Sequence, residues 1–117
     1  MLILKINFAV FFIFVGIMHI IKPALFRYFI PNGFPKLMVN YIVGLIEFGL
    51  GVGLFFDSTI SFAAIGIIIL LILFIPIHIW DATKERPAIG RKTTAYIRIV
   101  LQFLLIYCAF LIYQNSL

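Results

Sequence analysis

Four long apolar runs cover most of this 117-residue chain, and they constrain its fold more than any other feature. They lie at about residues 2–21, 37–56, 60–80 and 95–113. A bilayer core of roughly 30 Å is crossed by about 20 apolar helical residues, and each run meets that length. We therefore expect an all-α fold, a polytopic membrane protein built as a four-transmembrane-helix bundle.

The composition predicts a single transmembrane domain over residues 1–117. Hydrophobic residues make up 65% of the chain and charged residues 11%, whereas soluble domains are about half apolar and about a quarter charged. No polar block long enough to form a soluble domain interrupts the apolar runs. The lipid bilayer is therefore the expected partner of the whole chain.

The net charge of +5 does not indicate a nucleic-acid partner, because the basic residues form no stripe with interleaved aromatic residues. They indicate topology instead, since short cytosolic loops are enriched in Lys and Arg. The first and third loops hold most of them: Lys22, Arg27, Lys36, Lys84, Arg86, Arg91 and Lys92. The opposite side has only Lys5 and the amino terminus. We expect both termini outside the cell membrane and loops one and three in the cytosol.

A secretory signal peptide is the alternative interpretation of the first run, because Lys5 precedes an apolar stretch. The run ends at His19 to Pro23 without a small-x-small cleavage site, so we expect a retained helix. Turn-forming residues mark the first and third loops: Pro23, Pro31, Asn32, Gly33, Pro35, Pro87 and Gly90.

Polar side chains inside the apolar runs mark the candidate site, because an ionisable group in a spanning helix is costly and usually has a function. They predict one polar pocket: His19, Asn40, Glu47, His78, Arg98 and Gln102. Asp81 lies near them in the sequence. The single cysteine, Cys108, lies in an apolar run, which excludes an internal disulfide or a CxxC pair. No metal site is predicted, and no residue is assigned a catalytic role.

The helical rise predicts how deep these groups lie. His19 and His78 should reach a similar depth near the cytosolic ends of their helices, where they could meet. Glu47 should lie about 15 Å into the membrane at roughly 1.5 Å per residue. Arg98 could approach Glu47, and Gln102 should lie one helical turn from Arg98 on the same face.

Each of these groups also has a structural interpretation. Glu47 and Arg98 could form a buried ion pair that only fixes helix packing. Each histidine alone could satisfy a helix end. Asn40, Gly44, Glu47 and Gly51 share one helix face, and small-residue packing explains its glycines better than a bound cofactor does.

Several strings resemble one known family in their order and spacing. They are Gly16-Ile17-Met18-His19 with Lys22-Pro23, Pro31, Gly44-Leu45-Ile46-Glu47 with Gly51, Phe74-Ile75-Pro76 before His78, and Arg98-Ile99-Val100-Leu101-Gln102. Over nearly the whole chain they resemble the DoxX-like family of small four-helix membrane proteins. Members often carry a proline where this chain has Val100, and the likeness is loose at His78. The resemblance implies a link to quinone reduction or to thiol and oxidative-stress systems.

Three functions remain open, of which the first is implied by the resemblance. The first is a redox-associated subunit that binds a quinone, with a membrane or peripheral redox protein as partner; two histidines at equal depth would also permit haem. The second is a small proton-coupled transporter that uses Glu47, against which a neighbouring Arg98 argues. The third is a non-catalytic scaffold or chaperone for another membrane protein. A chain this small could also require a homo-oligomer to complete its site.

The loop charges predict that a reporter fused after Leu117 reports an extracytoplasmic carboxyl terminus, because the basic loops stay in the cytosol. Paired alkaline phosphatase and green fluorescent protein fusions measure this. A fusion that is active only in the cytosol contradicts the orientation.

Overall fold

The computed structural model describes residues 2–30, 33–84 and 92–116, and this part of the chain is all-α. Four long helices are joined by short segments, and two 3-10 turns lie in the first loop. In order the elements are α1 Leu2–Ile21, η1 Pro23–Leu25, η2 Arg27–Phe29, α2 Lys36–Gly53, α3 Ile60–Thr83 and α4 Lys92–Ser116. Arg86, Pro87, Gly90 and Arg91 of the predicted third loop lie outside the described residues, as do Pro31 and Asn32.

Helix α1 has the expected bounds, whereas the other three helices differ from the expected bounds at their ends. Helix α2 ends at Gly53 rather than at residue 56, because the Thr59 hydroxyl donates to the Gly53 carbonyl at 2.7 Å and closes a turn there. Helix α3 continues from residue 80 to Thr83, and α4 spans Lys92–Ser116 rather than 95–113. Hydropathy detects the apolar part of a helix, whereas backbone hydrogen bonding continues into the polar residues at its ends.

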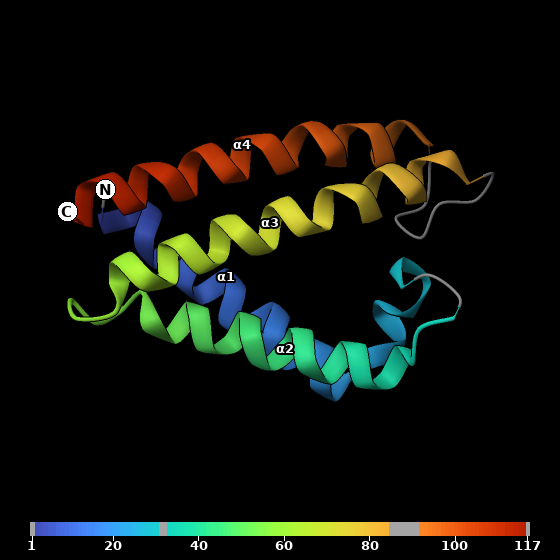
Figure 1. The fold of residues 1–117 in the computed structure, drawn as a ribbon, viewed down its shortest axis with the longest axis horizontal. Helices are drawn as coiled ribbons and strands as arrows, with labels where there is room; N and C mark the ends of the chain where they lie inside the picture. Colours follow the sequence, from blue (N-terminus) through green and yellow to red (C-terminus); the bar gives the residue numbers. More distant parts are fainter. Residues whose placement is uncertain (1, 31–32, 85–91, 117) are drawn as a thin grey trace.

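The helices form two antiparallel pairs, in which α1 packs on α2 and α3 packs on α4. Both termini and the turn between α2 and α3 lie at one end of the molecule (Figure 1). The turns η1 and η2 lie at the other end, where the two pairs draw apart. Gly33, which precedes α2, has a φ of +99°, a conformation that favours glycine.

Glycines let the backbones of α1 and α2 touch. A Cβ atom on Gly44 would lie 2.7 Å from the Gly16 carbonyl oxygen, and one on Gly51 would lie 2.9 Å from the Ala9 carbonyl oxygen. The face of α2 that the sequence singled out is buried as a unit: Asn40, Gly44, Glu47 and Gly51. Its glycines therefore pack against α1, which is the close-approach geometry of small residues in helix pairs.

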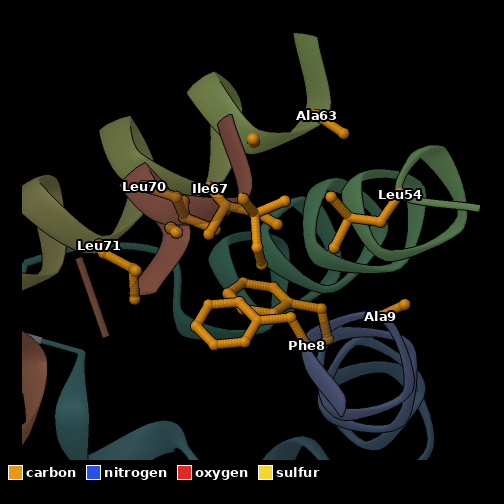
Figure 2. Packing of buried hydrophobic residues seen from close by; sticks show 11 residues of the cluster. Phe8, Ala9, Leu54, Ala63, Ile67, Leu70 and Leu71 are labelled. Atoms are coloured by element: carbon orange, nitrogen blue, oxygen red, sulfur yellow. The ribbon is translucent and has the colours of Figure 1, made fainter. Parts of the chain in front are cut away.

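The apolar core lies at the end of the molecule that carries the termini. Figure 2 shows Phe8 of α1, Leu54 after α2 and Ile67 of α3 converging there. Its buried members come from α1, α3 and α4 and from Leu54, which follows α2: Phe8, Ala9, Phe12, Leu54, Ala63, Ala64, Ile67, Leu70, Leu71, Ala109 and Ile112. This cluster joins the two helix pairs at that end.

All four helices are long and apolar enough to cross a membrane. Only 22% to 28% of the most apolar stretch of each helix is buried inside the molecule. Large apolar side chains therefore cover the outside, among them Ile3, Phe62 and Val100, each more than two-thirds exposed. Water would not favour such a surface, whereas lipid chains would.

The close approach of α1 and α2 predicts a large difference between two glycines of the same helix. Gly44→Ala should lower the free energy of unfolding by about 1–3 kcal/mol, because its methyl group would press on backbone. Gly49→Ala is the matched control, since a Cβ there meets nothing within 4 Å. The control should be neutral or stabilising by up to about 1 kcal/mol. Denaturant unfolding in detergent, followed by circular dichroism, measures both; equal effects would contradict the packing.

Candidate functional site

A cavity of about 280 Å³ lies between the two helix pairs, on the side of the apolar core that faces η1 and η2. All four helices and the first loop line it. Its apolar walls include five phenylalanines: Phe11, Phe12, Phe26, Phe29 and Phe74. Its polar lining consists of His19, Asn40, Glu47, His78 and Arg98. Five of the six predicted site residues therefore share one cavity, and Gln102 is the exception.

His19 and Asn40 form a buried hydrogen bond between α1 and α2. The Asn40 Nδ2 group donates to the Pro23 carbonyl at 3.2 Å, so its Oδ1 atom faces His19 Nδ1 at 2.8 Å. Because Oδ1 can only accept, His19 Nδ1 donates its proton. The ring also stacks on Phe26, with 3.8 Å between centroids. The imidazole is thus held in one orientation, with Nε2 on its other edge.

Glu47 lies on the cavity side of α2 and is 5% exposed. Its Oε2 atom is 3.7 Å from His19 Nε2, which is beyond hydrogen-bond distance. Oε2 is covered by protein and has no hydrogen-bond partner among the described residues. A buried acceptor without a donor is costly, so this carboxyl group is the polar group of the site that most requires a partner.

Arg98 and Gln102 form the polar part of α4. Arg98 Nη1 donates to Gln102 Oε1 at 2.7 Å, and Gln102 Nε2 donates to the Leu71 carbonyl at 2.8 Å. Gln102 is fully buried and does not line the cavity. Gln102 therefore orients Arg98 and connects α4 to α3. The connection lies close to Pro76 of α3, which has no backbone N–H group to donate within the helix.

Arg98 and Glu47 interact electrostatically across the cavity. The described residues contain no ion pair between them within 4.0 Å, so the predicted approach of Arg98 stops short of a direct contact. The charges of Glu47 and Arg98 therefore attract each other without contact, which leaves room for a ligand between the two side chains.

The two histidines line the same cavity without touching. His19 stacks on Phe26, whereas His78 meets Phe29 edge-on, with 5.8 Å between ring centroids. Both phenylalanines come from the first loop, in which the sequence analysis identified only basic and turn-forming residues. Their signal in the sequence is a run of three aromatic residues around Arg27, at positions 26, 28 and 29, in a short loop between prolines.

Asp81, predicted to lie near the site, is buried at the end of α3 and does not line the cavity. Its Oδ1 atom pairs with Lys84 Nζ at 3.3 Å, and the same ammonium lies 3.8 Å from the centre of a Trp80 ring. Among residues 2–30, 33–84 and 92–116, no three His, Cys, Asp or Glu side chains are grouped to hold a metal ion. Cys108 is half-buried and packs against the apolar core.

The buried Gln102 predicts a stability effect that an exposed glutamine of the same helix lacks. Gln102→Leu should lower the free energy of unfolding by about 1–3 kcal/mol, because it removes a partner from Arg98 and from the Leu71 carbonyl. Gln114→Leu is the control and should stay within about 0.5 kcal/mol, because that side chain is exposed. Chemical denaturation in detergent measures both, and a Gln102→Leu effect no larger than the control would contradict this role.

No curated protein and no solved structure matches the chain. A family model described as a domain of unknown function, DUF8561, matches residues 8–113. The match includes every polar residue of the cavity and reaches into all four helices. The chain belongs to the DUF8561 family.

Proposed function

We propose that this protein crosses the cell membrane four times and holds the headgroup of a membrane quinone in the cavity between its two helix pairs. It would act as a redox-associated subunit, in agreement with the resemblance to the DoxX-like family. The observation that carries the proposal is the cavity itself, which combines phenyl walls with protonatable groups on α1 and α2 and a guanidinium on α4.

The arrangement of charge supports the membrane part of the proposal. The end with η1 and η2 carries Lys22, Arg27, Lys36 and Lys84, and the opposite end carries Lys5. This asymmetry favours the orientation with both termini outside. The cavity then opens in the cytosolic half of the bilayer, where a lipid-soluble ligand could enter between the helix pairs.

The cavity walls support a flat, oxygen-bearing ligand. Phe26 and Phe29 can stack on a ring, and the opposite walls offer groups to the oxygens at its two ends. Arg98 donates hydrogen bonds and carries a fixed positive charge, which suits a carbonyl oxygen. His19 and Glu47 can exchange protons, which a quinone takes up on reduction and releases on oxidation.

The alternatives account for parts of the site. A proton-coupled transporter would also need a buried carboxyl group such as Glu47, but the nearby charge of Arg98 disfavours a cation beside it. A scaffold or chaperone explains Gln102, which serves helix packing. Neither function requires the phenyl walls around the cavity.

The proposal predicts that quinone remains with the protein through gentle extraction. Full-length protein taken from membranes in native lipid discs should carry quinone above its ratio to phospholipid in the parent membrane. Mass spectrometry of the extracted lipids measures this ratio. Protein that carries quinone only at the bulk ratio contradicts the proposal, and a co-purified protein without quinone would favour the scaffold.

Two matched pairs of variants test where the quinone binds. Arg98→Leu should lower the retained quinone by about ten-fold or more, because a hydrogen bond to a charged group is lost, whereas Lys5→Leu at the far end should not. Val43→Phe should exclude the ligand by filling the cavity, and Val100→Phe, on the exposed surface, should not. Loss in both members of a pair would place the effect outside the cavity.

A further inference from the structure

The Glu47 carboxyl group requires a hydrogen-bond donor that the described part of the protein does not supply. Glu47 is 5% exposed and lines the cavity, yet its buried Oε2 atom receives no hydrogen bond from a described residue. His19 Nε2 lies 3.7 Å from Oε2, beyond hydrogen-bond distance. A buried carboxylate in a protein normally accepts several hydrogen bonds.

The neutral His19 ring does not provide that donor. Its Nδ1 proton goes to Asn40 Oδ1, and the Asn40 amide is oriented by its bond to the Pro23 carbonyl. Stacking on Phe26 fixes the plane of the ring. With the proton on Nδ1, the neutral imidazole presents a lone pair at Nε2. Two acceptors, Nε2 and the Glu47 carboxyl group, therefore lie side by side on one wall of the cavity.

The wall formed by α4 has the opposite character. A guanidinium has five N–H donors and no acceptor. Arg98 donates from Nη1 to Gln102 and lines the cavity. A ligand that satisfies both walls therefore donates a hydrogen to the Glu47 side and offers an oxygen lone pair to Arg98.

We propose that the cavity recognises a ring hydroxyl group, which donates to the Glu47 carboxylate while oxygen on the ligand accepts from Arg98. This inference rests on the proposed function and specifies its ligand: the cavity selects the hydroxylated, quinol form over a form without an O–H group. The aromatic walls contribute affinity to both forms, and Glu47 distinguishes between them.

A pair of redox-stable aromatic probes tests the inference on the unaltered protein. 1-Naphthol and 1-methoxynaphthalene have the same ring and both retain an oxygen acceptor, but only naphthol donates a hydrogen. Calorimetric titration of the full chain in lipid nanodiscs, corrected for partition into empty nanodiscs, gives both affinities. We expect naphthol to bind about ten-fold more tightly or better, because the ether leaves the carboxylate without a donor.

The outcomes separate this inference from the function on which it rests. Equal affinities overturn the hydroxyl preference and leave the cavity as an aromatic site. Failure of both probes to bind overturns the inference together with the proposed function.

A matched pair of variants tests the role of Glu47. In Glu47→Gln the preference for naphthol should fall below about three-fold, since an amide can donate to the ether oxygen. Asp57→Asn, at the far end, should keep the full preference. A preference unchanged in Glu47→Gln would also overturn the assignment.

Discussion

The contact between the backbones of α1 and α2 is the constraint on which the site depends. Gly16 meets Gly44, and Ala9 meets Gly51, along one antiparallel register. Continuing that register by one turn brings His19 beside Asn40, where the two side chains bond. A larger side chain at the glycines would move the helices apart and shift the register. The position of the polar residues of this helix pair therefore depends on the glycines that pack the two helices together.

The contact between the two pairs is of a different kind. Close packing of Phe8, Leu54 and Ile67 joins them at one end, whereas a cavity separates them at the other. Two polar contacts connect α3 to α4, and both lie within one pair: Gln102 bonds to the Leu71 carbonyl, and the Ser61 and Ser116 hydroxyl groups bond to each other at the far end. The molecule thus consists of two tightly packed helix pairs, with a closed apolar end and an open polar end.

Hydropathy predicts the four helices because a bilayer-spanning length of apolar residues has few alternatives. It does not predict where α2 ends, because that depends on the hydroxyl of Thr59 reaching the Gly53 carbonyl. Helical spacing predicts the buried face of α2, because residues three and four positions apart lie on the same side of a helix. The spacing cannot show that Gln102 lies behind Arg98 rather than in the cavity, nor that Asp81 turns to Lys84. Those outcomes depend on how the helices pack.

The contacts of the first loop limit where this chain can accept inserted residues. Phe26 lies against His19 of α1, and Phe29 lies against His78 of α3, so one short segment contacts both helix pairs. The segment is a wall of the cavity as well as a connection. Its length is therefore fixed by the distance between the pairs, and an inserted residue would displace one ring or the other. By contrast, Asp57 and Ser58, in the turn between α2 and α3, are exposed and lie far from the cavity. Tags, labels and natural insertions are better accommodated in that turn than in the first loop.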